Sequence, residues 1–312
     1  MIGAGVMGAD HVRTLHRSVP GVEVSLVADL DPERAASTAQ PVGARATTDP
    51  ADVIAGSDAV IIASHDSTHA ELVLACLAAG RPVLCEKPLA PTVAECGRIV
   101  EAEGDRGLIA LGFMRRFDPA HVELKAAIGR VGAPLLVHCV SRNVSSAPGS
   151  TTESSITNSA IHEFDSVPWL LDSPITEVSW HAGRSAHGEF QDPQVMLLRT
   201  GNGVLTTLEV FLNARYGYET RCEVVGEEGA IALTDPARVV VDHARTHATG
   251  YAADWRPRYA DAYREELQAW VGALAAGLPN PLATARDGLR AAAVAEAVIA
   301  SMKDGRPAAV SA

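Results

Sequence analysis

The sequence predicts an α/β protein with two domains: an N-terminal doubly wound parallel sheet, and a C-terminal α+β domain with a large, mostly antiparallel sheet. Three observations predict this fold class. Short apolar runs alternate with Ala-rich helical stretches up to about residue 112, strand-like segments then follow one another directly, and two amphipathic helices close the chain. We predict a domain boundary after residue 114, which gives domains at 1–114 and 115–312. The last helix, at about 283–303, is a candidate to pack against the first domain.

The N-terminal third alternates between two kinds of segment. The strand candidates are almost continuously apolar, as in a parallel sheet covered by helices on both faces. They lie at 22–28, 59–63, 82–85 and 108–111. The helix candidates between them lie at 8–16, 31–38, 67–79 and 92–106. This alternation predicts a parallel sheet that binds its ligands at the carboxyl ends of the strands.

The C-terminal part changes rhythm after about residue 115. Strand-like segments now follow one another, some joined by turns such as the Thr-Gly-Asn-Gly stretch at 200–203, which predicts a largely antiparallel sheet. The segments lie at 135–141, 177–181, 195–199, 204–212, 221–226 and 230–233. The closing helices each place apolar residues on one face: Tyr263, Leu267, Trp270, Val271 and Leu274 in the first, and Val294, Val298 and Met302 in the second.

The stretch 141–159 is rich in Ser, Thr and Asn. Its composition is typical of a flexible surface loop. It also lies between a strand and a helix that carries a candidate catalytic histidine, and this position is equally typical of an ordered substrate-binding loop. Both interpretations stay open for the sequence alone.

Composition and charge exclude several classes of function. The 312 residues carry a net charge of −12 and are 47% hydrophobic, a globular composition whose acidity disfavours nucleic acids and anionic membranes as partners. No apolar run reaches the roughly 18 residues of a membrane helix, and no signal peptide is apparent. The five cysteines are scattered without metal-ligand spacing, as in a reducing compartment. We therefore expect a cytoplasmic protein.

The chain opens with a glycine motif, G-x-G-x-x-G at Gly3, Gly5 and Gly8. The first glycine permits a tight turn, the second lets a pyrophosphate approach the backbone, and the third lets the helix pack on the strand. The N–H groups of the helix start, including those of Val6 and Met7, would face the pyrophosphate. This pattern is typical of a Rossmann domain that binds a dinucleotide.

An acidic residue supports this interpretation. The predicted strand 22–28 ends at Asp29, 21 residues after Gly8, where a carboxylate binds the adenosine ribose hydroxyls. A carboxylate at this place repels a 2′-phosphate, so the sequence predicts NAD as the cofactor in preference to NADP.

The first strand of such a domain is expected four to six residues before the first glycine, but only Met1 and Ile2 precede Gly3. Loss of a central strand would cost buried apolar surface. We therefore expect the natural chain to begin upstream of Met1; the alternative is a sheet that tolerates a two-residue strand.

Several further runs carry a resemblance to a known family. They are Cys-Glu-Lys-Pro at 85–88, Gly-Phe-Met-Arg-Arg-Phe-Asp at 112–118, His-Cys-Val-Ser-Arg-Asn at 138–143, Ile-His-Glu-Phe-Asp at 161–165, Tyr-Gly-Tyr at 216–218 and Ala-Tyr-Arg-Glu-Glu-Leu-Gln at 262–268. The chain resembles the glucose–fructose oxidoreductase/inositol dehydrogenase (Gfo/Idh/MocA) family over nearly its whole length. Within that family it is most similar to the myo-inositol 2-dehydrogenases.

The resemblance implies NAD-dependent oxidation of a cyclitol hydroxyl, with Lys87 and His162 as the catalytic pair. Lys87 follows a strand of the parallel sheet, so its ammonium can reach a substrate oxygen at the ligand-binding edge. An imidazole such as that of His162 is a suitable base for the hydroxyl proton. The resemblance also implies that Arg115 and Asn143 bind substrate hydroxyls, that the bond before Pro88 is cis, and that the protein is a homodimer or homotetramer.

Other residues are expected near the cofactor: Ser64, His65, His69 and Glu86, together with Lys87. His65 and His69 form an H-x-x-x-H pair, but they lack the glutamate of the zinc-protease motif and a third ligand. We therefore expect no metal site.

Two departures from the family pattern concern the helix of His162. The family has an aspartate four residues before this histidine, where this chain has Asn158, which is expected on the same helical face and near the substrate. An amide cannot stabilise an imidazolium by charge, so a weaker base is expected. Pro168 is expected to kink the helix or restart it about four residues earlier.

Two alternatives to a cyclitol dehydrogenase stay open. A dehydrogenase of a pyranose or anhydrosugar would use the same Lys87 and His162, because substrate choice depends on hydroxyl contacts in the pocket. A non-catalytic sensor of NAD or sugar is favoured by Asn158 and by the short first strand, and disfavoured by the intact Lys87 and His162.

Overall fold

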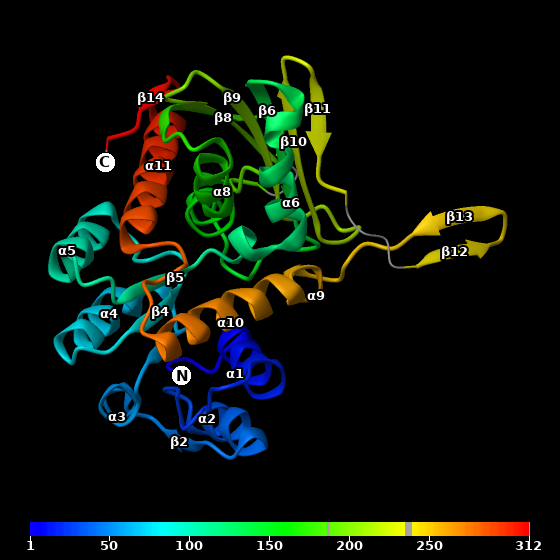
Figure 1. The fold of residues 1–312 in the computed structure, drawn as a ribbon. Helices are drawn as coiled ribbons and strands as arrows, with labels where there is room; N and C mark the ends of the chain where they lie inside the picture. The colour runs from blue at the N-terminus through cyan, green and yellow to red at the C-terminus, as the bar shows by residue number, and fades with distance from the viewer. Residues whose placement is uncertain (186–187, 235–238, 312) are drawn as a thin grey trace. The chain divides into compact units, whose positions relative to one another are not determined.

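The computed structural model describes residues 1–185, 188–234 and 239–311, and it divides into two compact units. Unit 1 comprises Met1–Phe117 and Asp261–Ala292, and unit 2 comprises Asp118–Ala260 and Ala293–Ala312. Figure 1 shows the elements of both units along the chain. Within the described ranges, no helix has the length and apolarity needed to cross a membrane.

The sheet of unit 1 is parallel, as predicted. Its strands are β1 (Leu26–Ala28), β2 (Arg45–Thr47), β3 (Val60–Ile62), β4 (Val83–Glu86) and β5 (Ile109–Gly112). β1 pairs with β2, and β3, β4 and β5 pair in sequence order. β3, β4 and β5 are buried along their whole length, which explains their continuous apolar runs.

Met1 and Ile2 join these two parts of the sheet. Ile2 forms parallel bridges to both Ala28 and Ile62, and its N–H donates to the Ile61 carbonyl at 2.8 Å. The carbonyl of Met1 accepts from the N–H of Ala28 at 2.9 Å. The two-residue segment therefore takes the central position of the sheet between β1 and β3.

The helices of unit 1 include α1 (Val6–Ser18), α2 (Pro32–Ala39), α3 (Pro50–Gly56), α4 (His69–Ala78), α5 (Val93–Glu103) and most of α10 (Ala260–Ala276). Short 3₁₀ turns lie at Gln40–Val42, Asp66–Thr68 and Met114–Phe117. Asp31 and Asp49 cap α2 and α3, each followed by a proline at the first helical position. The apolar face of α10 packs in the core of the unit through Leu267, Trp270 and Val271, as its spacing predicts, whereas Leu274 of the same face is exposed.

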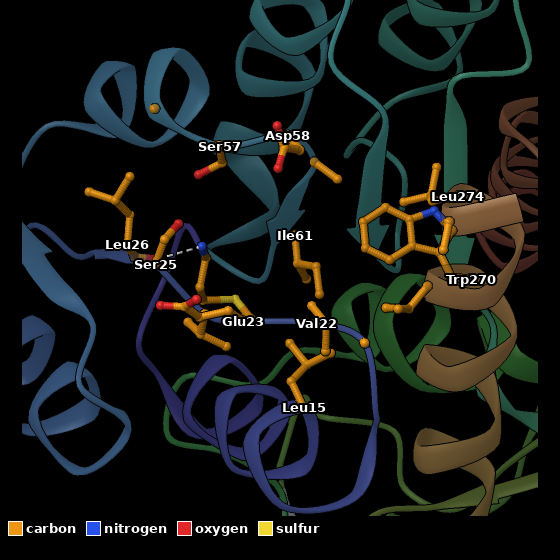
Figure 2. A pocket seen from close by; sticks show the side chains of 17 residues that line it. Leu15, Val22, Glu23, Ser25, Leu26, Ser57, Asp58, Ile61, Trp270 and Leu274 are labelled. Atoms are coloured by element: carbon orange, nitrogen blue, oxygen red, sulfur yellow. Dashed lines mark hydrogen bonds between the residues drawn. The ribbon is translucent and has the colours of Figure 1, made fainter. Parts of the chain in front are cut away.

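β1 is shorter than the predicted strand 22–28, because residues 22–25 lie outside the ladder. They line a cavity of about 510 Å³ at the amino ends of β1 and β3, which Figure 2 shows. Leu15, Ile61 and Trp270 provide apolar walls there, while Ser57 and Asp58 provide polar atoms. Of residues 22–25, only Val24 is partly buried and the other three are exposed, so the two valines of this segment do not mark a paired strand.

Unit 2 contains a seven-stranded sheet in the order β11-β10-β6-β9-β8-β7-β14. Its strands are β6 (Pro134–Arg142), β7 (Ile175–Ala182), β8 (Gln194–Thr200), β9 (Leu205–Phe211), β10 (Glu219–Gly226), β11 (Gly229–Ala232) and β14 (Ala308–Ala309). All neighbours are antiparallel except β6 and β9, which pair in parallel. The predicted mostly antiparallel sheet is therefore confirmed, including the turn at 200–203 between β8 and β9.

The helices of unit 2 include α6 (Pro119–Ala127), α7 (Thr152–Ser155), α8 (Ile161–Leu171) and α9 (Trp255–Arg258), with a 3₁₀ turn at Ile128–Val131. α11 (Ala285–Asp304) begins in unit 1 and ends in unit 2, where Ser301 accepts from the N–H of Trp180 at 3.0 Å. The prediction that Pro168 restarts the helix is wrong, because α8 runs through it to Leu171. A proline removes one ladder hydrogen bond, and the buried side chains of α8 outweigh that loss.

Four strands were not predicted, and neither were the helices α3, α6, α7 and α9. β2 is largely exposed, and α3 is only 7 residues long, so neither gives a strong apolar pattern. β12 (Val240–His243) and β13 (Thr246–Thr249) form a fully exposed hairpin. Its turn places Ala244 and Arg245 at positive φ without the usual Asn-Gly or Asp-Gly pair. β14 has only 2 residues.

The end of β10 provides a test of the packing in unit 2. A Cβ atom on Gly226, which lies at a register shift in β10, would overlap the backbone of Val131. We expect Gly226→Ala to lower the free energy of unfolding by about 1–3 kcal/mol. Gly272→Ala is the control: the position lies on an exposed part of α10 with open space for a Cβ. This change should be neutral or stabilise by up to about 1 kcal/mol. Equal thermal midpoints for the two variants would contradict this account.

Candidate cofactor and substrate sites

The three glycines of the opening motif have three different roles. Gly3 has a φ of +90°, and a Cβ there would lie 2.5 Å from the Ser64 nitrogen. A Cβ on Gly8 would overlap the carbonyl of Gly3, so the turn and α1 can approach only without side chains. Gly5 is the N-cap of α1, and a Cβ there would meet nothing within 4 Å. The turn is thus closed on its inner side and open beside Gly5, as a pyrophosphate requires.

A cavity of about 540 Å³ lies beside this turn, at the carboxyl ends of β1 and β3. Five of the predicted cofactor residues line it: Gly3, Gly5, Asp29, Ser64 and His65. Leu30, Arg34, Thr48 and Leu72 add to its wall. The cavity is large enough for part of a dinucleotide, and both the glycine turn and the Asp29 carboxylate line it.

Asp29 is bound by the backbone on both carboxylate oxygens. Its Oδ2 accepts from the N–H of Ala4 at 2.8 Å, and its Oδ1 accepts from the N–H of Asp31 at 2.9 Å. Ala4 belongs to the glycine turn, so Asp29 fixes the turn and the end of β1 to each other. The carboxylate keeps lone pairs for further donors, such as ribose hydroxyls.

Arg34 was missed by the sequence interpretation. Its Nε lies 3.8 Å from Oδ1 of Asp29, and the side chain is half-exposed in the cavity wall. The Asp-Pro start of α2 is a signal that could have located it, because Asp31 caps the helix and its carboxylate accepts from the N–H of Arg34 at 3.3 Å.

His65 and His69 lie in different environments, one in the wall of the cavity and the other in the interior of unit 1. His65 lines the cavity, where its Nδ1 lies 2.8 Å from the Asp66 carboxylate. His69 is buried, and its Nδ1 lies 2.7 Å from the Pro88 carbonyl, so it connects α4 with the segment after β4. Among the described residues, no group of three or more potential ligand side chains is placed to hold a metal ion.

Lys87 follows β4 at the carboxyl end of the sheet, and the Lys87–Pro88 bond is cis, as the resemblance implied. Burial lowers the pKa of Lys87 below its ordinary value. The Glu86 carboxylate opposes this shift and the Arg115 charge adds to it. Arg115 is itself buried in the turn after β5. The structure therefore brings Lys87, Glu86 and Arg115 into one electrostatic group.

Glu86 is expected near the cofactor, and its carboxylate has two protein partners. Its Oε1 lies 2.7 Å from Nε2 of His11, and its Oε2 accepts from the backbone N–H of Lys87 at 3.2 Å. Glu86, Val6, Met7, Gly8 and His69 do not line the described cavity.

Unit 2 carries the predicted substrate residues Asn143 and Asn158 and the predicted base His162. Asn143 follows β6, and its backbone N–H donates to the Phe211 carbonyl at 2.9 Å. His162 is the second residue of α8, while Asn158 lies in a π-helical turn, Ile156–Ala160. A π turn closes over five residues in place of four. The expected i, i+4 alignment of Asn158 with His162 in a regular α-helix is therefore altered.

The segment before α8 is ordered at both ends. Ser146 donates from its N–H to Oδ1 of Asn213 at 3.1 Å. Thr151 and Ser154 form a reciprocal capping box at the start of α7. These contacts favour the ordered interpretation of the stretch 141–159.

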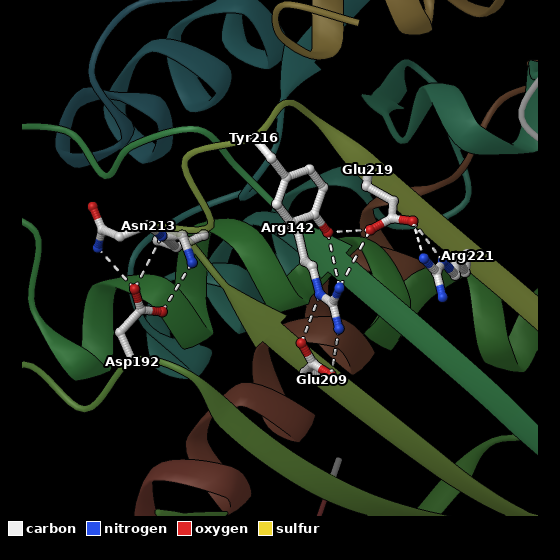
Figure 3. Close-up of polar contacts among 8 residues, drawn as sticks. Arg142, Asp192, Glu209, Asn213, Tyr216, Glu219 and Arg221 are labelled. Carbon is white, nitrogen blue, oxygen red and sulfur yellow. Dashed lines mark hydrogen bonds and ion pairs between the residues drawn. The ribbon is translucent and has the colours of Figure 1, made fainter. Parts of the chain in front are cut away.

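A charged network fixes the end of β6 next to Asn143, as Figure 3 shows. Arg142 donates to both carboxylate oxygens of Glu209, at 2.7 and 2.9 Å, and to the Tyr216 hydroxyl at 2.8 Å. The hydrogen bonds to Glu209 raise the pKa of Arg142. Tyr216 in turn donates to Glu219, which also binds Arg221. The sequence does not reveal this network, because its members come from different strands.

A second network in Figure 3 holds the loop after β9. Asp192 is buried and accepts from the N–H of Leu212 at 2.9 Å and from the side-chain amide of Asn213 at 2.7 Å. Asn213 holds Ser146, so the carboxylate of Asp192 supports the segment that begins at Asn143.

The site residues thus belong to two sets. Unit 1 offers a glycine turn, a carboxylate for hydroxyl groups and the partly buried Lys87 at the end of β4. Unit 2 offers an imidazole and amides suited to substrate hydroxyls. The pairing of Lys87 with His162 stays a prediction.

Comparisons with known proteins agree over both parts of the chain. A family model described as an oxidoreductase family with an NAD-binding Rossmann fold matches residues 1–113, and its C-terminal alpha/beta domain model matches 126–310. Inositol 2-dehydrogenase 2 of Paenarthrobacter aurescens is 56% identical, over 97% of this chain and 95% of that protein. Inositol 2-dehydrogenase 1 of Saccharopolyspora erythraea is 47% identical, over 98% and 94%.

A solved structure is similar along the whole chain. It is that of myo-inositol dehydrogenase from Lactobacillus casei in complex with NAD(H) and myo-inositol. The TM-score is 0.95 at 31% identity, and the match covers 100% of this chain and 96% of that one.

Gly5 allows a direct test of the glycine turn. Gly5→Ala should fold with a thermal midpoint close to that of the parent, because a Cβ there meets nothing within 4 Å. It should nevertheless lose dinucleotide binding, measured by calorimetry, because the new side chain occupies the approach to the turn. Binding of NAD at the parent affinity would show that the pyrophosphate does not lie beside Gly5.

Proposed function

Because this chain belongs to the oxidoreductase family with an NAD-binding Rossmann fold, we propose that it oxidises a secondary hydroxyl of a cyclitol to the ketone and transfers the hydride to NAD. The substrate is myo-inositol or a related inositol. The full-length identity of 56% to a protein named as an inositol 2-dehydrogenase carries this conclusion.

The cofactor residues fit NAD. The cofactor, when bound, supplies the hydride acceptor. The glycine turn and the start of α1 hold its pyrophosphate, and Asp29 binds the adenosine ribose hydroxyls. Asp29 also selects against the 2′-phosphate of NADP by charge.

The chemistry of the substrate requires two proton-handling groups. His162 accepts the hydroxyl proton as the carbon loses hydride, and Lys87 donates a hydrogen bond to the reacting oxygen and stabilises its developing negative charge. Burial of Lys87 supports this role, because a desolvated ammonium interacts more strongly with an alkoxide. Arg115, Asn143 and Asn158 bind the remaining hydroxyls.

One observation favours a different substrate of the same class. Asn158 stands where inositol dehydrogenases are expected to have an aspartate, and it lies in a π turn. A pyranose or anhydrosugar presents other hydroxyls to this position, so such a sugar is the second candidate. The chain is an NAD-dependent oxidoreductase, which disfavours the alternative of a non-catalytic sensor.

We further infer a homodimer or homotetramer in the cytoplasm. The five cysteines are all unbridged and buried, which supports a reducing compartment. Light scattering on the purified protein measures the oligomeric state.

The proposed catalytic pair is tested by Lys87→Ala and His162→Ala. We expect each change to lower kcat with NAD and myo-inositol by a factor on the order of 10²–10⁴, the usual effect of losing an acid–base group. NAD affinity, measured separately by calorimetry, should persist in both. Activity within tenfold of the parent would remove that residue from the mechanism.

Cofactor choice is tested by Asp29→Ser. This variant should use NAD less well and NADP better, because the repulsion of the 2′-phosphate is gone. The ratio of kcat/KM for the two cofactors reports the change. If the parent already uses NADP as well as NAD, the role given to Asp29 is wrong.

The role of Asn158 is tested by Asn158→Asp. If the side chain faces His162, the new carboxylate favours the protonated imidazole. The ring must be neutral to accept a proton, so the plateau of the pH–rate profile should begin about one pH unit higher. Rates on the plateau should exceed those of the parent. An unchanged profile and no gain on any cyclitol would point to a substrate contact and favour the sugar alternative.

A further inference from the structure

His11 is a fully buried polar side chain that no part of the proposed mechanism uses. It lies on the face of α1 that also buries Gly8, Val12 and Leu15. Its ring packs edge-on against Tyr263 with the ring centres 5.7 Å apart. The helix that begins at the glycine turn thus carries this imidazole into the interior of unit 1.

The partner of His11 is the Glu86 carboxylate, and that carboxylate is held on both oxygens. Nε2 of His11 lies 2.7 Å from Oε1, and the backbone N–H of Lys87 lies 3.2 Å from Oε2. Gly112 pairs with Glu86 across β4 and β5, and a Cβ there would lie 3.3 Å from Oε2. The carboxylate therefore fits between His11 and Gly112 in one orientation.

The direction of the hydrogen bond follows from the other ring nitrogen. Nδ1 of His11 is buried and has no hydrogen-bond partner among the described residues. A proton there would be an orphan donor, whereas a bare nitrogen costs less. His11 therefore carries its proton on Nε2 and donates to Glu86. Burial alone would raise the pKa of Glu86, but this hydrogen bond and the nearby Lys87 charge lower it, so Glu86 stays ionised.

The ionised carboxylate acts on Lys87. Among the charged groups of the described residues, Glu86 and Asp66 favour the charged form of this ammonium, and Arg115 disfavours it. Glu86 is the largest of these influences after burial. Any change that moves or neutralises the Glu86 carboxylate therefore favours the neutral amine.

We propose that His11 is a positioning residue for the oxidation: its Nε2–H holds the Glu86 carboxylate, which in turn keeps Lys87 placed and charged. This inference rests on the proposed role of Lys87. It gives α1 a second role, because the helix that receives the pyrophosphate at its start also supports the Lys87 ammonium through His11 in its second turn.

The protonation of Lys87 is measurable without enzyme turnover. The chain has only three lysines, Lys87, Lys125 and Lys303. Reductive methylation modifies the neutral amine, and peptide mass spectrometry follows each lysine separately as a function of pH. The exposed Lys303 reports the pH dependence of the reagent itself.

The central variants are His11→Leu and Glu86→Gln. Glu86→Gln removes the charge, so the midpoint of Lys87 methylation should fall by about one pH unit or more. His11→Leu should shift it in the same direction by a smaller amount. The double variant should match Glu86→Gln, because His11 acts through that carboxylate. If His11→Leu does not fold, His11→Phe, which keeps a ring against Tyr263 but lacks the donor, takes its place.

Two controls separate positioning from stability. His11→Gln keeps an N–H donor and should retain the parent midpoint. His121→Leu disrupts a similar buried pair in unit 2, where Nδ1 of His121 lies 2.6 Å from Asp118. It should lower the thermal midpoint without moving the methylation midpoint of Lys87. A parent-like Lys87 midpoint in folded His11→Leu would overturn the proposal, and so would an equal shift in His121→Leu.

Kinetics complete the test. His11→Leu should lower kcat for myo-inositol by about tenfold to a hundredfold, with the basic limb of the profile at lower pH. The KM for NAD should stay near the parent value. If the parent itself does not reduce NAD with any cyclitol, the proposed function fails, and the methylation result still decides whether His11 controls Lys87.

Discussion

The buried carboxylate of Glu86 is the interaction on which the arrangement of unit 1 depends. An ion of this kind costs on the order of several kcal/mol to bury unless hydrogen bonds compensate it. Here the donors come from His11 on α1 and from the backbone of Lys87, and Gly112 on β5 leaves the space. One carboxylate thus connects α1, β5 and the end of β4 that leads into Lys87.

In unit 2, charged side chains likewise form hydrogen bonds that connect separate segments, here at the ends of strands. Arg142 binds Glu209 across β6 and β9, and Asp192 holds Asn213 and, through it, Ser146. These contacts fix loops that would otherwise be free to move. The proposed cofactor residues therefore lie on a glycine turn in unit 1, and the proposed substrate residues on hydrogen-bonded loops and a helix in unit 2.

The features of the structure that the sequence predicts are those that depend on residues close together in the chain. The glycine turn, Asp29 and the amphipathic helices each follow from neighbouring residues, and the cis bond at Lys87 followed from the family resemblance. The bond between His11 and Glu86 spans 75 residues, so no local pattern reveals it. The exposed hairpin of β12 and β13 lacks both an apolar face and a glycine turn, and it was missed for that reason.

Transfer of hydride from a cyclitol carbon to NAD is the central claim, and isotope labelling tests it most directly. The protein would be incubated with NAD and myo-inositol deuterated on every ring carbon, and the reduced cofactor analysed by mass spectrometry. We predict that the reduced cofactor carries one deuterium, and that Lys87→Ala forms almost none. Reduced cofactor without the label, or no reduction with myo-inositol or any other cyclitol, would contradict the account.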